Sequence, residues 1–506
     1  MHIDIQQATI TAFPADLLIV NLFEGVTRPG GGTGAIDGAL GGRISQLIAL
    51  GDCTGKLGET TLLHTFGALP APRVLVVGLG GSAGFDLSAA RTAAAKAIAA
   101  AGNAGARTVA TIVHGAGVGG LEAGEAAEAL VEASLLETYR MPRQSSESPS
   151  LPAVTTLTLV ESNVDKLPAL LAGARRGQIV AESVCFARDL IAAPSNLATP
   201  GYLAAAARMM AGEVGLGCTV LEQPEIEALG MGILLGVAKG SDEPPRFVVL
   251  EHNAGRADEL DTVVLVGKGV SFDTGGYTLK AGEGAPGMWK MKGDMTGAAD
   301  VMAALRAAAL LDLPLHVVGL APLVENMING RAQKPGDVYR GMSGKTMEVI
   351  STDAEGRMIL ADALAYAGRF AAKAVVDIAT LTAAIGLALG SRAAGLFCAD
   401  QSLADRLLAA AEASGERLWP MPMYDDYRQD IKSDFADVKN STLPNKYAGV
   451  STSAKFLQHF TEAYPWAHID MANMSWVESP RPLYPRGFSA FGARLLIRFL
   501  RDWRLP

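Results

Sequence analysis

The chain has 506 residues, 49% of them hydrophobic, and a formal net charge of −9. This length exceeds one ordinary domain, so we expect two. The negative charge provides no general attraction to phosphate backbones or anionic lipids, which argues against nucleic acid and membrane surfaces as partners.

The sequence also indicates a cellular location. The first twenty residues, MHIDIQQATITAFPADLLIV, lack a basic n-region and a small-residue cleavage site. The longest apolar run, residues 378–390, is too short to span a bilayer. Four cysteines are widely separated and form no CxxC pair, which is typical of reduced thiols. We expect a soluble, cytoplasmic protein.

Residues 1–165 are expected to form a small N-terminal α/β domain. They alternate β-branched runs with alanine-rich helical stretches, a pattern typical of strands and covering helices. The expected strands lie at 16–23, 73–80, 108–115 and 155–160.

A long helix is predicted from Pro168 to Ile191, and its first part, 166–181, links this domain to the next. Residues 182–506 should form a larger C-terminal α/β domain. Strand-like runs occur there at 247–253, 262–270, 315–322 and 374–380. The expected fold class is therefore α/β, with two domains.

Several short motifs suggest other chemistry but are incomplete. GLGGSAG, 78–84, fits a loose dinucleotide pattern, yet no acid lies between Asp86 and Glu122 to bind a ribose. GMSGKT has Tyr339 where a phosphate-binding loop needs its first glycine. The GxSxG string around Ser82 lacks an oxyanion element, and no HExxH occurs. We interpret these segments as ordinary turns.

Carboxylates and lysines are instead concentrated in glycine-rich, otherwise apolar segments. VGKGVSFDTGGYTLK, MKGDMTGAAD and STDAEGR together supply Lys268, Asp273, Lys280, Asp294, Asp353, Glu355 and Arg357. Lys268 and Asp273 follow an apolar strand, at the edge of an open α/β sheet where ligand crevices form.

Four converging carboxylates would repel one another unless cations neutralised them, and two divalent ions would balance the four charges. Oxygen ligands with one lysine nitrogen suit Zn²⁺, Mn²⁺ or Mg²⁺ in a dinuclear site. Lysine can bind a metal only as the neutral amine, so we expect burial and cationic neighbours to depress its pKa.

With these motifs the chain resembles the leucine aminopeptidase family of cytosolic dinuclear metallopeptidases. The family signature NTDAEGRL appears as STDAEGRM, accompanied by ENMINGRAQKPGDV and DIATLT. The resemblance covers nearly all of 180–480, and it implies that 182–506 is the catalytic α/β domain, with a mixed central sheet. It implies that Asp273 and Glu355 bridge two metals, that Lys268 and Asp294 complete the tighter site, and that Asp353 completes the more exchangeable one.

The resemblance implies roles for other residues too. Lys280 would polarise the scissile carbonyl, and Arg357 would hold a bicarbonate ion as general base. The substrate's free α-amine would bind one metal, restricting cleavage to the first residue of a peptide. The pocket for that residue would comprise Met291, Thr380, Ala383, Ala472 and Ser475. A homohexamer is also implied.

Three departures from the family pattern concern the pocket. AGEGAPGMWKMKG, 281–293, is three residues longer than usual, which predicts a reshaped loop at the site entrance. Ala383 replaces the usual glycine, and YPRGFSAFGARLL replaces a GATG-like segment.

We expect an aminopeptidase that releases leucine-like or other apolar N-terminal residues. Two alternatives stay open: a dipeptidase such as a Cys-Gly hydrolase, and a non-catalytic DNA-binding or regulatory protein of the same fold.

Overall fold

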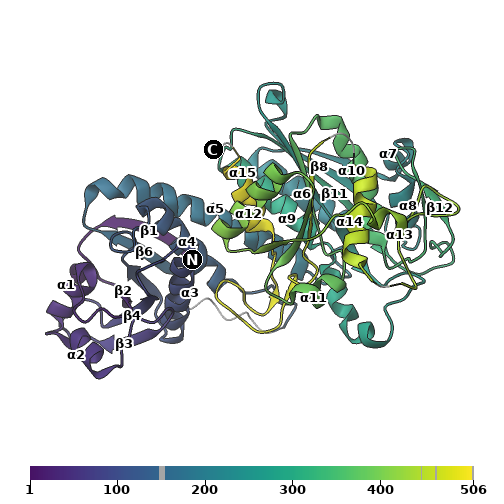
Figure 1. Ribbon diagram of the computed structural model, residues 1–506. Coiled ribbons are helices and arrows are strands. Elements are labelled where there is room, and N and C mark those ends of the chain that lie inside the picture. Colours follow the sequence, from purple (N-terminus) through teal and green to yellow (C-terminus); the bar gives the residue numbers. More distant parts are fainter. Residues whose placement is uncertain (147–153, 446, 462–463, 504–506) are drawn as a thin grey trace. The chain divides into compact units, whose positions relative to one another are not determined.

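A computed structural model of the chain describes residues 1–146, 154–445, 447–461 and 464–503, without the side chains of 282–286. The chain forms two compact units (Figure 1). The N-terminal unit comprises Met1–Cys185 with Ser479–Arg486, and the C-terminal unit comprises Phe186–Glu478 with Gly487–Pro506.

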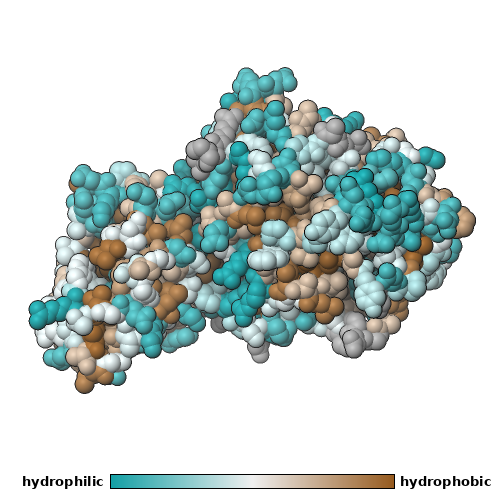
Figure 2. Space-filling view, in the orientation of Figure 1, coloured by the Kyte–Doolittle hydropathy of each residue, from teal (hydrophilic) through white to brown (hydrophobic). Residues whose placement is uncertain are grey.

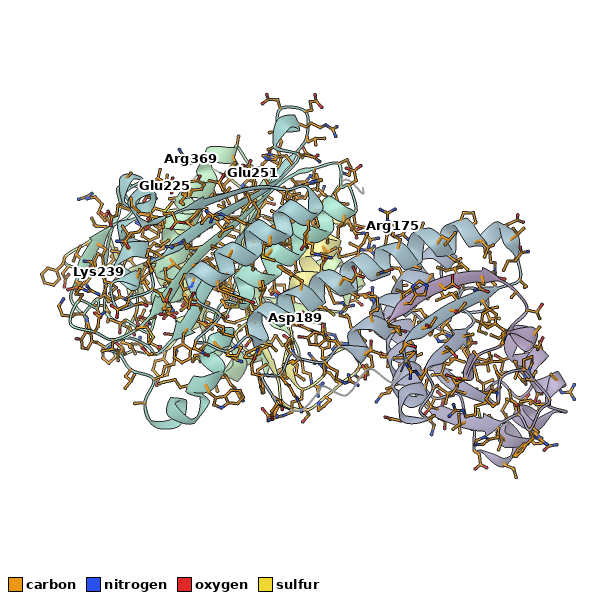
Figure 3. The ribbon with its side chains drawn as sticks, turned by 180° about the vertical axis from the view of Figure 1, so that it is seen from behind. Arg175, Asp189, Glu225, Lys239, Glu251 and Arg369 are labelled. Atoms are coloured by element: carbon orange, nitrogen blue, oxygen red, sulfur yellow. The ribbon has the colours of Figure 1, made fainter. Side chains whose placement is uncertain are left out.

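The long helix expected from Pro168 to Ile191 is present as α5, Leu167–Ala192. The division between the units falls inside it, after Cys185. Arg175 and Asp189 lie along this one helix in Figure 3. The segment 479–486 departs from the predicted continuous domain 182–506 because it groups with the N-terminal unit, where the Leu483 N–H donates to Glu137 at 2.9 Å.

The N-terminal unit is built on a sheet with the order β1-β6-β5-β2-β4-β3. Pairing is parallel except between β3 and β4. The strands are β1 His2–Gln7, β2 Leu17–Phe23, β3 Thr60–His64, β4 Arg73–Gly80, β5 Thr108–Thr111 and β6 Thr156–Glu161. The helices before α5 are α1 Gly31–Ala39, α2 Arg43–Leu50, α3 Leu87–Asn103 and α4 Ala123–Thr138.

Strand periodicity explains how this sheet is covered. Leu18, Val20 and Leu22 alternate along β2 and pack with Ile36 and Ile44 of the first two helices. Helix α3 contacts β3 and β4, and it packs closely on α4 because both helices are rich in alanine. The four predicted strands of this unit are therefore confirmed, while β1 and β3 were not predicted.

The C-terminal unit contains the larger, mixed sheet, with the order β16-β15-β18-β14-β9-β11-β8-β7 and β10 paired to β11. Strands β18, β14, β9 and β11 are mutually parallel, whereas β8 runs antiparallel to β11. The strands are β7 Gly217–Leu221, β8 Arg246–His252, β9 Thr262–Gly267, β10 Gly269–Asp273, β11 His316–Asn326, β14 Ala374–Ala379, β15 Ala394–Cys398, β16 Leu418–Pro420 and β18 Trp466–Asp470.

Helices cover both faces of this sheet (Figures 1 and 3). Helices α8, α10 and α14 share a core with Val264 and Val266, whereas α6, α9, α12 and α15 lie on the other face. The helices are α6 Pro200–Val214, α7 Gln223–Ala228, α8 Gly232–Ala238, α9 Thr296–Leu310, α10 Glu355–Ala367, α11 Ala384–Leu389, α12 Gln401–Ser414, α13 Tyr427–Asp430, α14 Gly449–Phe460 and α15 Ala493–Arg501.

Two small sheets complete the unit. One contains β12 Val338–Arg340, β13 Thr346–Glu348 and β17 Val438–Lys439, and the other contains β19 Trp476–Val477 and β20 Gly487–Phe488. Hydrophilic and apolar residues are interspersed over the face seen in Figure 2. Among the described residues, none of the helices has the length and apolar character needed to cross a bilayer.

Candidate metal centre

The candidate site lies where neighbouring strands of the larger sheet end. Lys268 directly follows β9, Asp273 is the last residue of β10, and Thr380 directly follows β14. Asp294 and Glu355 stand at helix beginnings, shortly before α9 and at the first position of α10. Parallel strands bring their carboxyl ends to one edge, so residues far apart in sequence meet there.

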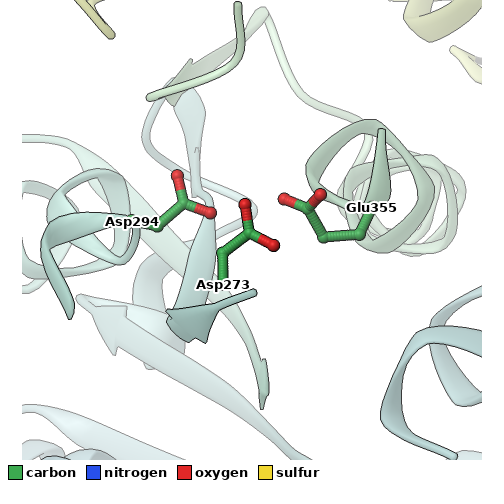
Figure 4. Close-up of side chains that lie close together, drawn as sticks. All are labelled: Asp273, Asp294 and Glu355. Atoms are coloured by element: carbon green, nitrogen blue, oxygen red, sulfur yellow. The ribbon is translucent and has the colours of Figure 1, made fainter. Parts of the chain in front are cut away.

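Three carboxylates converge at this edge. Oxygen atoms of Asp273, Asp294 and Glu355 all lie within 4.8 Å of one another, and the three side chains are buried. Figure 4 shows the carboxyl groups directed toward a common space from different elements. Asp353 is more exposed and joins the group through Lys280, whose Nζ lies 2.6 Å from its Oδ1. The structure thus brings together all four predicted carboxylates.

Two lysines neutralise part of this charge. The Lys268 ammonium donates to Asp294 and to the Thr380 carbonyl oxygen, each at 2.8 Å, and lies 3.0 Å from Glu355. Lys280 lies 2.7 Å from Asp273. The sequence-based expectation that only metal ions would neutralise the four carboxylates is therefore incomplete. Two ammonium groups offset half of the four negative charges.

The pKa values follow burial and charge. Burial raises the pKa of Asp273, of Asp294 and of Asp353, the last to about 6. Burial also acts on Glu355, but the charges of Lys268 and Lys280 outweigh it and hold the pKa of this carboxyl at about 2. Burial therefore dominates the pKa shifts of the three aspartates, whereas the two ammonium groups dominate the shift of Glu355.

Lys268 departs from the expected depressed pKa. Burial lowers its pKa, but the adjacent Asp294 and Glu355 carboxylates outweigh burial and raise it. The expectation assumed cationic neighbours, whereas the chain itself surrounds this amine with anions. The neutral amine that a metal ligand requires therefore depends on cations occupying the site.

The residues present fit divalent cations. Buried carboxylate oxygens from three different elements face one space, and the site adds a lysine nitrogen and a fourth carboxylate. Hard oxygen donors in this number suit Mg²⁺, Mn²⁺ or Zn²⁺. Carboxylates gathered in this way bind such ions through charge neutralisation that lysines only partly provide.

Arg357 lies two residues after Glu355, in the first turn of α10. Its guanidinium donates to the Asn440 carbonyl oxygen at 2.8 Å, while its buried Nε has no hydrogen-bond partner among the described residues. Burial lowers its pKa to about 10, against the opposing charges of Glu355 and Asp470. A buried guanidinium N–H without an acceptor is suited to an anion.

Two of the five residues predicted to form a pocket contact Asp294 of the cluster. The Thr380 hydroxyl donates to Asp294 at 2.7 Å, and the Met291 carbonyl oxygen accepts the Asp294 N–H at 3.1 Å. Ala472 is held by Asp470, which also accepts the N–H groups of Leu381 and Thr382.

The other two residues of the predicted pocket, Ser475 and Ala383, lie next to the segments that Asp470 holds. Ser475 donates to the Ala472 carbonyl oxygen at 3.2 Å, and Ala383 immediately follows the loop that Asp470 holds. Asp470 therefore connects the two segments that carry most of the predicted pocket.

The longer entrance segment forms 3₁₀ turns from Gly282 to Gly293. Trp289 packs edge-to-face on Trp476, with ring centroids 5.1 Å apart, and Trp476 contacts Phe488 in the same way. Lys290 lies over both indoles and 3.2 Å from Glu478. Lys292 lies over the Phe488 ring, so the two segments that depart from the family pattern also contact each other directly.

Sequence reasoning missed the buried amides that hold the site. Asn326 donates to Asp273 at 2.8 Å, and Asn440 accepts the N–H groups of Ile350 and Ser351. The motif ENMINGR contains Asn326, but an asparagine after an apolar strand gives no signal of its own. Its proximity to Asp273 is set by strand register.

The fold and the buried carboxylates and lysines at the sheet edge together indicate the class of protein: an α/β protein with a cation-binding site made of carboxylates. Profiles described as the cytosol aminopeptidase family, catalytic domain, and the same family's N-terminal domain match residues 185–497 and 19–148. The chain belongs to the cytosol aminopeptidase family and is an aminopeptidase of the leucine aminopeptidase type.

Individual relatives agree over their full lengths. A probable cytosol aminopeptidase of Geobacter sulfurreducens is 44% identical over 504 residues, covering 99% of each chain. A solved mutant of tomato leucine aminopeptidase superposes with a TM-score of 0.87 at 30% identity, covering 99% of this chain and 96% of that one. Bottromycin maturation enzyme BotP in complex with Mn gives a TM-score of 0.85 at 34% identity, covering 97% and 99%.

Proposed function

We propose that this aminopeptidase removes leucine-like or other apolar residues from peptide N-termini at a site holding two divalent cations. The convergence of Asp273, Asp294 and Glu355 within 4.8 Å carries this proposal. Lys268 and Asp353 would complete the ligand set, and Asp273 and Glu355 would serve both ions. Such ions would supply Lewis acidity and a water of lowered pKa.

The chain's own charged groups have distinct tasks in this reaction. Lys280, held between Asp273 and Asp353, presents an ammonium that can donate to the carbonyl oxygen of the scissile bond. Neighbouring carboxylates raise its pKa despite burial, which favours the protonated ammonium. A fixed positive donor of this kind stabilises the negative charge that develops on that oxygen.

Arg357 would hold a bicarbonate ion, which would supply a general base. Its buried Nε without a partner among the described residues supports an anion there. The first side chain of the substrate would lie against Met291, Thr380, Ala383, Ala472 and Ser475, which are mostly small or apolar. This lining favours an apolar residue.

Membership of the family also suggests the metal ions, the cellular location and the oligomeric state. We propose Zn²⁺ or Mn²⁺ as the ions, with Mg²⁺ as a further candidate, a cytoplasmic location and a homohexamer. The manganese complex of BotP and the name of the Geobacter relative support the ion type and the location. Gel filtration with light scattering tests the assembly, for which six chains are expected.

Amide variants of the shared carboxylates test the function. Glu355→Gln and Asp273→Asn should abolish leucyl-anilide hydrolysis and lower the metal bound per chain, measured by mass spectrometry, because each removes a negative ligand. Glu412→Gln, an exposed position on α12, makes the same chemical change away from the site and should leave both quantities unchanged. Full activity in either site variant refutes the site.

A substrate panel tests the preference. Aminoacyl anilides that differ in the first residue should be cleaved fastest when that residue is apolar, and longer peptides should also be cleaved. Faster cleavage of Cys-Gly than of every apolar substrate would identify a dipeptidase instead.

A further inference from the structure

Strand register delivers Asn326 to the cation site. Asn326 ends β11 and lies opposite Asp273, which ends the parallel strand β10. The pairing shifts between Val270 and Phe272, and an irregularity of this kind re-aims the residues that follow it. The Asn326 side chain is 1% exposed, whereas the preceding Glu325 faces away and accepts a hydrogen bond from Ser241.

The amide of Asn326 contacts both carboxylates proposed to be shared by the cations. Its Nδ2 donates to Asp273 Oδ1 at 2.8 Å and lies 3.5 Å from Glu355 Oε2. The same nitrogen donates to the carbonyl oxygen of Thr352 at 3.0 Å, in the turn that carries Asp353 and Glu355. One side chain thus links the end of β10 to the beginning of α10.

The surrounding chain fixes the amide in place. Gly276, at a φ of +60°, passes so close that an added Cβ would lie 2.8 Å from Thr352 Oγ1 and 3.1 Å from Asn326 Oδ1. The Thr352 hydroxyl in turn donates to the Gly275 carbonyl oxygen at 2.6 Å. Only a residue without a Cβ fits this close approach, so the turn closes over the amide and limits its movement.

The chemistry of an amide suits this position. In the metal-free protein, the protonated Lys268 and Lys280 also bind the carboxylates, and in that form their positive charge competes with a metal ion for the same oxygens. An amide N–H orients a carboxylate without adding charge, and hydrogen bonds of this kind to ligand groups are a general feature of metal sites. Leucine has the same branching and number of side-chain heavy atoms without an N–H, and aspartate would add a fifth negative charge.

We propose that Asn326 is a positioning residue that holds Asp273 and Glu355 in the cation-binding arrangement and thereby sets the metal affinity of the apoprotein. The inference rests on the proposed function only in that these carboxylates bind cations. Asn326 does not contact the substrate, so its effect is on metal affinity before any peptide binds.

The test is calorimetric titration of Mn²⁺ into the chelator-treated full-length protein. Asn326→Leu should weaken Mn²⁺ binding roughly 10- to 100-fold, as is typical when an orienting partner of a metal ligand is lost. Asn326→Ser, which keeps a smaller donor, should give an intermediate loss and provides the measurement if the leucine variant does not fold. Affinity within about twofold of the wild type in the serine variant, or in a folded leucine variant, overturns the proposal.

Asn440→Leu is the matched comparison. Asn440 is also fully buried and holds the same turn, but it binds the backbone of Ile350 and Ser351 and the Met358 sulfur instead of a carboxylate. It should lower the melting temperature of the apoprotein with a smaller loss of Mn²⁺ affinity than Asn326→Leu. Equal losses of affinity would show that both asparagines only support the turn, which overturns the proposal.

The two proposals fail separately. A wild-type protein that binds two Mn²⁺ ions without releasing amino acids would refute the peptidase function and leave the role of Asn326 intact. An active wild type whose Asn326 variants bind Mn²⁺ normally would refute only the role of Asn326.

Discussion

The two units share an architecture, but their strand edges carry different side chains. In both, helices cover a mainly parallel core of strands whose carboxyl ends share one edge. In the C-terminal unit that edge carries Lys268, Asp273 and Glu355 in one buried cluster. In the N-terminal unit the chain after β5 supplies instead the buried His114, with its Nδ1 bonded to Asn21. A strand edge thus becomes a cation site only where register brings several charges together.

Gly356→Ala should have the largest effect on activity, because it displaces Lys268 at the edge of the larger sheet. A Cβ at this position would lie 2.3 Å from Lys268 Cε and 2.5 Å from Nζ, so the lysine must move. Alanine suits a helix better than glycine, so α10 should persist while activity falls at least ~100-fold. Steady-state kinetics with leucyl-anilide and bound-metal analysis provide the measurements.

Gly212→Ala is the matched control for that variant. Gly212 lies in α6 with open space around its Cα, so the added methyl meets no other atom. It should stabilise the protein by roughly 0.5–1 kcal/mol and leave the activity unchanged. Retained activity in Gly356→Ala would show that Lys268 can move without consequence.

A pH titration probes the other edge. Burial lowers the pKa of His114 to about 4, below its value in the unfolded chain. Between about pH 6.5 and 4 the unfolded state therefore binds a proton that the folded state excludes, so stability is complete above this window and decreases as the pH falls through it. The free energy of unfolding of the N-terminal unit should decrease by up to about 3 kcal/mol.

Hydrogen exchange of peptides covering β5 measures this decrease. His114→Gln keeps an acceptor for Asn21 but cannot titrate, so its exchange should change less with pH across this window. An unchanged pH dependence in this variant would show that other groups destabilise the unit in acid.

Ala383→Gly has the smallest expected effect and tests whether Ala383 lines the predicted pocket. Removing the methyl should raise kcat/KM for phenylalanyl-anilide relative to alanyl-anilide by about 10-fold, because one methyl group in a pocket typically changes discrimination by that order. Ala388→Gly, the same change at an exposed position of α11, should leave the ratio unchanged. An unchanged ratio in Ala383→Gly excludes Ala383 from the pocket wall.

Local sequence patterns were sufficient for the main elements. The apolar runs ending before Lys268 and Thr380 became β9 and β14, and the segment starting at Pro168 became a helix, because burial and periodicity act within short windows. Short or edge elements such as β1 and β3 gave no comparable signal. The association of 479–486 with the N-terminal unit also escaped prediction, since it depends on contacts such as Leu483 with Glu137.

Some residues of the candidate site could likewise be predicted from the sequence, and others could not. The family-like motifs identified the carboxylates and lysines, but not Asn326, Asn440 or Asp470, which act by holding other groups. The direction of the Lys268 pKa shift was also inaccessible, because it depends on which charges surround the amine after folding.

The sequence by itself determined the class of fold, the family and the side chains able to bind cations, since these follow from composition, periodicity and motifs along the chain. Only the tertiary structure decided which of them meet. Separations of a few ångströms depend on the pairing of β10 with β11 and on the beginning of α10 beside them. Charge interactions at that range control protonation, and no linear pattern encodes them.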